Sequence, residues 1–191
     1  MRTLILLGHP DKNSFCARLA DSYEQGAVEK GGDVMRINLI DLRFDPILKK
    51  GYRSQQNLEA DLIEAQRLIK WANHIVIIFP VWWSAPPALL KGFIDRVFLP
   101  GFAFKYRENS SYWDKLLLGR SARLIITSDA PVFWLYFMYF HPALNMMKKA
   151  LLEFCGISPV AVTSFGSMKN ASEKKREGLL YQAYRIGLDD N

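Results

Sequence analysis

Five short runs rich in apolar residues, each followed by a stretch with helical spacing, restrict the folds that are open to this chain. The runs cover residues 3–7, 34–39, 75–79, 122–127 and 159–165. An apolar run of this length is typical of a strand that is covered on both faces in a parallel sheet. Parallel strands need crossover connections, which are usually helical, so the segments between the runs are expected to contain helices.

The segments between the runs agree with this expectation. In the first of them, Phe15, Leu19, Tyr23 and Val28 recur at near-helical spacing. The expected helices run from residue 13 or 14 to the glycine pair at 31–32, and over residues 58–69, 87–97, 142–154 and 172–187. Five strands that alternate with five helices predict an α/β fold, an open, doubly wound parallel sheet with helices on both faces.

Length, composition and charge narrow the class of protein. A chain of 191 residues fits one domain, and 50% hydrophobic residues indicate a globular protein. The net charge of +6 is spread along the chain without a Lys/Arg block, so we expect no nucleic-acid partner. Cys16 and Cys155 lie far apart without metal-ligand spacing, which predicts reduced thiols, no metal site and a cytoplasmic location.

The hydrophobic segments are too short for a membrane protein. Residues 4–7 are too few for a signal peptide, and residues 132–140 form a run of nine where a membrane-spanning helix needs about twenty. We therefore expect a soluble protein. The aromatic-rich segment 132–140 still needs burial, against a partner subunit or over a ligand.

Three loops are expected to leave the carboxyl ends of the strands, where ligands of such sheets bind. They cover residues 8–15, 80–87 and 127–131. The first loop leads into a helix, whose N-terminus is a natural phosphate site, and His9, Asn13 and Ser14 could add side-chain donors. The alternative is that Asn13 or Ser14 simply caps the helix.

The second loop carries the most distinctive chemistry. The apolar run 75–79 stops at Pro80, and Trp82 and Trp83 follow before a proline pair at 86–87. Aromatic rings and proline-rich backbone form a rigid, flat wall that suits a planar ligand. A ring-shaped cofactor is therefore indicated, and flavin is the leading candidate.

Several motifs resemble one known family. They are Leu7-Gly8-His9-Pro10 with Asn13-Ser14-Phe15, residues 79–83, 87–92 and 96–98, Gly101-Phe102-Ala103-Phe104, and Glu153-Phe154-Cys155-Gly156. In this order and over nearly the whole chain, they resemble the NAD(P)H:quinone oxidoreductase branch of the flavodoxin-like superfamily. The resemblance implies a flavodoxin-like sheet with strand order 2-1-3-4-5 and a homodimer with its sites at the interface. It also implies a flavin, FMN or alternatively FAD, which passes a hydride from NAD(P)H to a quinone-like acceptor that binds after NAD(P)⁺ has left.

The same resemblance assigns roles to residues. The phosphate end of the flavin would be held by His9, Asn13, Ser14, Phe15 and Cys16. The isoalloxazine ring would be held by Pro80, Val81, Trp82 and Trp83, and its polar edge by Thr127 and Ser128. Asp129 stands where many members have glycine, so a carboxylate is expected to alter the environment of the ring edge.

His141 has two interpretations. It lies near the position of the family's active-site histidine and could donate a proton to a reduced quinone. It could equally cap the helix that follows. Two other functions stay open beside the enzyme, namely a regulatory subunit of a membrane transporter and, less favoured because the chain is basic, an electron carrier of flavodoxin type.

Overall fold

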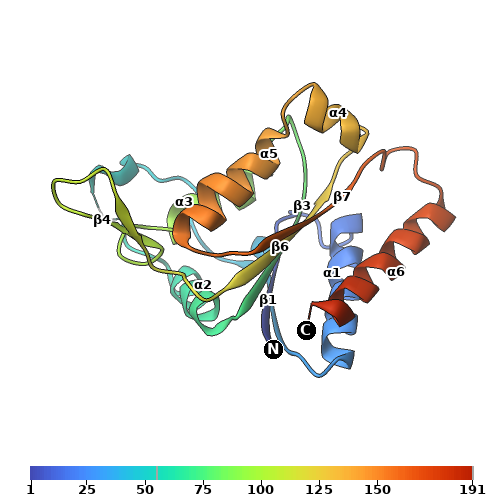
Figure 1. Cartoon of the computed structure of the whole chain (residues 1–191), viewed down its shortest axis with the longest axis horizontal. Coiled ribbons are helices and arrows are strands. Elements are labelled where there is room, and N and C mark those ends of the chain that lie inside the picture. Colours follow the sequence, from blue (N-terminus) through green and yellow to red (C-terminus); the bar gives the residue numbers. More distant parts are fainter. Residues whose placement is uncertain (55, 191) are drawn as a thin grey trace.

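The computed structural model describes residues 1–54 and 56–190 and contains a five-stranded parallel sheet with helices on both faces (Figure 1). The strands of the sheet are β1 (Arg2–Leu7), β2 (Asp33–Asn38), β3 (His74–Pro80), β6 (Ser121–Thr127) and β7 (Val160–Phe165). The α-helices are α1 (Phe15–Glu29), α2 (Ala60–Trp71), α3 (Ala88–Val97), α4 (Val132–Phe137), α5 (Pro142–Asn145) and α6 (Glu173–Asp189). The remaining elements are the 3₁₀ turns η1 (Leu39–Asp41) and η2 (Gly51–Arg53), the π-helix η3 (Met146–Glu153), and an antiparallel hairpin of β4 (Phe104–Tyr106) and β5 (Trp113–Lys115).

The strands lie in the order β2-β1-β3-β6-β7, which is 2-1-3-4-5 when the five strands of the sheet are counted along the chain. Neighbouring strands are parallel, and Pro80 at the end of β3 pairs with Thr127 at the end of β6. All seven residues of β3 are buried, as expected for a central strand with both faces covered. The predicted doubly wound sheet is confirmed.

Each face of the sheet has its own core. Side chains of a strand alternate between the two faces, so Leu4 and Leu6 of β1 join one core while Ile5 and Leu7 join the other. The first core is completed by α2, α3 and η3, and the second by α1 and α6. Figure 1 shows α1 and α6 together on one side of the sheet and α2, α3 and α5 on the other.

Several expected boundaries need correction. The second strand was expected over residues 34–39, but β2 ends at Asn38 and Leu39 begins the turn η1, where its side chain is fully buried. The fourth helix, expected over 142–154, begins as the four-residue α5 and continues as the π-helix η3. Apolar spacing does not distinguish i→i+4 from i→i+5 hydrogen bonding over so few turns.

Candidate functional site

The three predicted loops leave the carboxyl edge of the sheet side by side. Their strands β1, β3 and β6 are neighbours, and backbone hydrogen bonds continue past the strand ends. The N–H of Gly8 donates to the carbonyl of Ile78 at 2.8 Å, and the N–H of Val81 donates to the carbonyl of Thr127 at 2.8 Å. The backbone therefore ties the first two loops to the neighbouring strands.

Two side-chain contacts bring the loops closer together. The ring of His9 meets the ring of Trp82 edge to face, with centroids 5.4 Å apart. The thiol of Cys16 lies 3.2 Å from the hydroxyl of Thr127, inside the protein. The first loop thus contacts the second through an aromatic pair, and α1 contacts the end of β6 through a buried hydrogen bond.

The first loop is folded by its own polar groups. The N–H of Asp11 donates to Nδ1 of His9 at 2.9 Å, and the Asp11 carboxylate accepts from the N–H of Asn13 at 2.8 Å. Ser14 is the N-cap of α1, and its hydroxyl oxygen accepts from the N–H of Ala17 at 3.3 Å. The capping interpretation is confirmed for Ser14.

Capping leaves part of the helix N-terminus free to bind an anion. The first backbone N–H groups of a helix have no acceptor within the helix itself. In the described part of the chain, no hydrogen bond satisfies the N–H groups of Phe15 and Cys16, the first two residues of α1. Because the positive end of the helix dipole lies at the same point, this position favours a phosphate group.

His9 is neutral at pH 7. Burial lowers its pKa, and the nearby Asp11 opposes this shift only in part. Since Nδ1 accepts a hydrogen bond from the backbone, the proton of the neutral ring lies on Nε2. His9 can therefore donate from Nε2 to a ligand.

The second loop turns sharply at the tryptophan pair. Trp82 and Ala85 exchange backbone hydrogen bonds, and the two residues between them, Trp83 and Ser84, have φ angles of 50° and 60°. Such values at both central positions define a type I′ turn. A bulky residue in this region is strained by about 1–3 kcal/mol, and such strain concentrates at functional sites. The turn presents Trp83 fully exposed and Trp82 half exposed, next to the buried Pro80.

Hydrogen bonds of Ser128 to backbone carbonyls hold the third loop. Ser128 is buried; its N–H donates to the carbonyl of Phe165 at 2.9 Å, and its hydroxyl donates to the carbonyl of Ala130 at 2.8 Å. The hydroxyl hydrogen of Ser128 is thus used within the loop, and only its oxygen can serve a ligand. Asp129 is exposed beside it.

His141 lies apart from these contacts. It is 2% exposed, has a φ of 44°, and accepts through Nδ1 a long hydrogen bond of 3.4 Å from the N–H of Leu144, as the N-cap of α5. Its Nε2 is buried, and no hydrogen-bond partner for it lies among the described residues. Burial lowers the pKa of His141, so the ring is neutral and its proton lies on Nε2. The capping interpretation is confirmed, and the catalytic interpretation stays a prediction, since no described contact joins His141 to the three loops.

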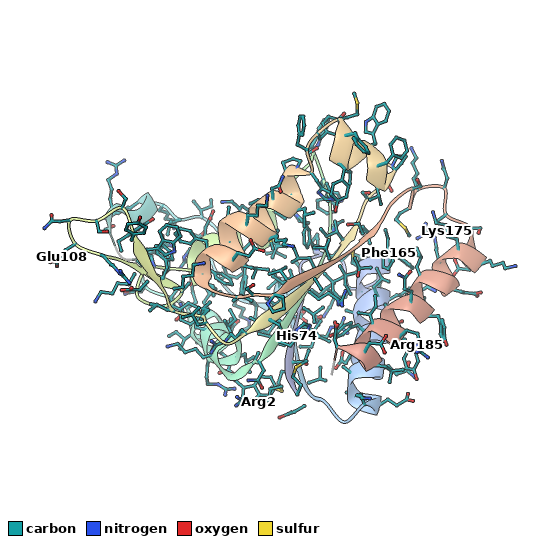
Figure 2. All side chains as sticks on the ribbon, in the orientation of Figure 1. Arg2, His74, Glu108, Phe165, Lys175 and Arg185 are labelled. Atoms are coloured by element: carbon teal, nitrogen blue, oxygen red, sulfur yellow. The ribbon has the colours of Figure 1, made fainter. Side chains whose placement is uncertain are left out.

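The segment 132–140 is largely exposed in the single chain. Six rings form what we call the aromatic surface, namely Phe133, Trp134, Tyr136, Phe137, Tyr139 and Phe140, with exposed fractions from 42% to 79%. Figure 2 shows ring side chains around α4 that project away from the sheet. The sequence did not predict α4, because a uniformly apolar run shows no helical periodicity.

A cavity of about 380 Å³ lies outside the three loops, between α3, η3 and the β4–β5 hairpin. Phe104, Tyr106 and Phe154 contribute to its lining. Trp113 stacks on Phe154 with centroids 4.4 Å apart and donates from its indole N–H to the Phe154 carbonyl. Trp113 therefore supports the wall of this cavity.

Within residues 1–54 and 56–190, no group of three or more His, Cys, Asp or Glu side chains is arranged to hold a metal ion. None of the described helices combines the length and the apolar character needed to span a bilayer.

Comparison with known proteins gives consistent matches along the chain. The family model described as flavodoxin-like fold matches residues 1–185. A protein of Haemophilus influenzae named uncharacterized NAD(P)H oxidoreductase is 30% identical over 185 residues, covering 94% of this chain and 91% of its own. The NAD(P)H dehydrogenase (quinone) 1 of Cavia porcellus is 26% identical over 181 residues, covering 81% of this chain and 64% of its own.

Solved structures agree with this match. Smu.1420 from Streptococcus mutans superposes with a TM-score of 0.84 at 34% identity, over 99% of this chain and 100% of its own. An FMN-dependent NADH-azoreductase from Bacillus anthracis, solved with FMN, has the same fold at 22% identity, with a TM-score of 0.75 over 99% of this chain and 96% of its own. The order and spacing of the loop motifs, the sheet topology and these matches lead to one conclusion: this chain belongs to the flavodoxin-like family of the NAD(P)H:quinone oxidoreductases.

Proposed function

We propose that this chain is a flavin-dependent oxidoreductase that transfers two electrons from NAD(P)H to a quinone-like acceptor. The observation that carries the proposal is the meeting of three loops at the carboxyl edge of the sheet, through the His9–Trp82 and Cys16–Thr127 contacts. One loop offers anion donors, the second offers aromatic and proline surfaces, and the third offers hydroxyl groups. Such a combination fits a ligand with a phosphate at one end and a flat ring at the other.

The donor set of the first loop fits the phosphate end of a flavin. Within the part of the chain that the structure describes, the N–H groups of Phe15 and Cys16 have no acceptor, and the Nε2 proton of His9 and the side chains of Asn13 and Ser14 lie on the same loop. Pro80, Val81, Trp82 and Trp83 would support the ring, and Thr127, Ser128 and Asp129 would lie at its polar edge. A bound flavin supplies the ring that accepts and returns a hydride, while the protein supplies position and electrostatics.

The chain's own residues would assist the delivery of a proton, and the two substrates would bind one after the other at the same place. NAD(P)H gives up a hydride and leaves as NAD(P)⁺, and the acceptor then takes its place. A quinone needs one hydride and one proton to become a hydroquinone. We assign this step to His141: its Nε2–H, which has no partner within the described residues, can hydrogen-bond to the quinone oxygen as negative charge develops there, and the proton that completes the hydroquinone comes from water.

We also propose the identity of the flavin, the assembly state and the location of the protein. FMN is the proposed flavin and FAD the alternative, and the name of the similar azoreductase from Bacillus anthracis supports FMN. A cytoplasmic homodimer is proposed. Six exposed rings lie together in the aromatic surface, which is more than single scattered rings on a protein surface, and a second copy would cover them. Neither curated relative described above is named as a transporter subunit, so the enzyme is preferred to the regulatory function.

The visible absorption spectrum of the purified protein tests the proposal, with released cofactor identified by chromatography. A flavin spectrum, together with oxidation of NADH or NADPH that depends on added benzoquinone, is the expected result. A colourless protein that takes up neither FMN nor FAD would refute the flavin site. Flavin binding without quinone-dependent turnover would instead favour a carrier or regulatory function.

A further inference from the structure

Cys16 combines two features that a phosphate-binding residue does not need. It lies in the first turn of α1, yet its side chain is 2% exposed and reaches Thr127, a residue 111 positions away at the end of β6. In the described structure, the 3.2 Å contact between Sγ and the Thr127 Oγ1 is the only hydrogen bond of either side chain. Thr127 is itself 6% exposed, so water satisfies neither group well.

Either atom of this pair can be the donor, and the two arrangements differ in what they leave free. When the hydroxyl donates to sulfur, the thiol hydrogen has no acceptor. When the thiol donates to the Thr127 oxygen, the hydroxyl hydrogen is free to point at a ligand. A hydroxyl is a better donor than a thiol, so it will pair with the strongest acceptor within reach.

The thiol keeps its hydrogen over the physiological pH range. Burial raises the pKa of Cys16 to about 11, although the hydrogen bond to Thr127 works in the opposite direction. Cys16 is therefore neither a nucleophile nor an anion at neutral pH, and its S–H is permanently available. The same property makes it unsuited to a redox role of its own.

We propose that Cys16 is a positioning residue for the flavin ring edge: its thiol donates to Thr127, so that the Thr127 hydroxyl donates to the bound cofactor. The inference rests on the proposed function, because Thr127 is assigned there to the polar edge of the ring. Cys16 then has two separate roles. The backbone N–H of Cys16 faces the anion at the helix N-terminus, and its side chain orients a hydroxyl on the neighbouring strand.

Three variants separate this role from simple packing. Cys16→Ser keeps a donor of similar size, Cys16→Ala removes the donor, and Cys155→Ala removes the other buried thiol, for which no side-chain hydrogen bond is described. The dissociation constant of FMN is measured by quenching of flavin fluorescence, and the melting temperature of each apoprotein is measured in parallel. Loss of a net hydrogen bond of about 1 kcal/mol corresponds to about fivefold weaker binding.

We expect Cys16→Ala to bind FMN about five- to tenfold more weakly, and Cys16→Ser and Cys155→Ala to bind within about twofold of the wild type. If Cys16→Ala and Cys155→Ala lower the melting temperature of the apoprotein equally, a difference between their FMN affinities is due to the lost hydrogen bond of Cys16 and not to general destabilisation. Unchanged affinity in Cys16→Ala, or an equal loss in Cys16→Ser, would overturn the positioning role while leaving the flavin site intact.

A spectroscopic readout does not depend on activity. In the Cys155→Ala protein, Cys16 is the only remaining thiol, because the chain has two cysteines. Its S–H stretching band in the infrared should shift to lower frequency when FMN is added, as the thiol becomes the donor. A band that stays in place while FMN binds would refute the change of donor. A wild-type protein that binds neither flavin would refute both the positioning role and the proposed function.

Discussion

The two ring nitrogen atoms of His141 have different environments. Nδ1 caps α5, while Nε2 carries the proton of a neutral ring and is buried, with no acceptor among residues 1–54 and 56–190. A buried donor without a partner costs about 1–3 kcal/mol, which the fold has to offset elsewhere. Capping by Nδ1 and a hydrogen bond from Nε2 to the acceptor are therefore compatible, because they use opposite sides of the same neutral ring.

Asparagine at position 141 separates these two uses. Asn tolerates the left-handed backbone seen at His141 and is a good N-cap, but its shorter side chain has no donor at the position of Nε2. We expect His141→Asn to slow quinone reduction by about 100-fold and to leave reduction of the flavin by NAD(P)H within about twofold. Stopped-flow measurement of each half-reaction checks this, with circular dichroism as the control for folding. Equal slowing of both half-reactions would show that His141 acts through structure alone.

Trp83 allows a second test at a single residue. Its side chain is fully exposed, so Trp83→Ala should leave the melting temperature of the apoprotein unchanged. If the indole supports the ring, the same variant should retain less flavin after gel filtration, and Trp82→Ala, which also loses the contact to His9, should lower both quantities. Full flavin retention in Trp83→Ala would remove this residue from the ring site.

At the scale of elements, the sequence predicted what depends on local patterns. The apolar runs placed the five strands, and the residues before Phe15 correctly indicated the N-terminus of α1, capped by Ser14. The β4–β5 hairpin has strands of three residues each, too short for a periodic signal. The Cys16–Thr127 hydrogen bond joins elements that only the folded sheet brings together, so no local pattern could have predicted it.

The pairing of α1 and α6 depends on two glycines. A Cβ atom added at Gly26 of α1 would lie 2.1 Å from the carbonyl oxygen of Tyr184, and one added at Gly187 of α6 would lie 2.2 Å from that of Tyr23. Real Cβ atoms do not approach a carbonyl oxygen so closely. The two backbones therefore lie in direct contact, and this contact holds α6 against the sheet by way of α1.

Gly26→Ala should lower the free energy of unfolding by about 1–3 kcal/mol, because the helices would have to separate. Gly178→Ala on α6 is the matched control. It is exposed, with nothing within 4 Å of the added Cβ, so the better helix propensity of alanine should stabilise the protein by about 0.5–1 kcal/mol. Urea unfolding of both variants measures the two effects. A stable Gly26→Ala protein would mean that α1 and α6 do not pack this closely.

At the scale of the whole molecule, Asp190, the C-cap of α6, joins several elements at the end of the sheet opposite the three loops. Asp190 accepts from Arg123 of β6, with 2.7 Å between Nη2 and Oδ1, and from the hydroxyl of Tyr23 at 3.1 Å. His74 of β3 lies 3.5 Å from the same carboxylate. In Figure 2, His74 lies on this side of the sheet. One carboxylate thus links α6, α1 and two strands.

The charge of Asp190 makes this link dependent on pH. Burial alone would raise the pKa of Asp190, but the hydrogen bonds and charge of Arg123, with a smaller effect of His74, outweigh it and hold the pKa well below its ordinary value. The folded protein therefore keeps the carboxylate ionised where the unfolded chain, with a pKa of about 3.9, takes up a proton. The stabilisation is fully present above pH 4 and is lost progressively as the pH falls below it.

Asp190→Asn should therefore lower the free energy of unfolding by about 3 kcal/mol at pH 7, since Arg123 would remain half-buried without its partner. Below pH 4 the difference from the wild type should shrink, because the unfolded wild-type chain binds a proton at Asp190 while the folded protein does not. Asp189→Asn, an exposed neighbour with the same change of charge, should have an effect below about 0.5 kcal/mol. Urea unfolding from pH 7 to pH 3 measures all three proteins. A difference that persists unchanged at pH 3 would mean that the amide disturbs packing and that the ion pair does not stabilise the fold.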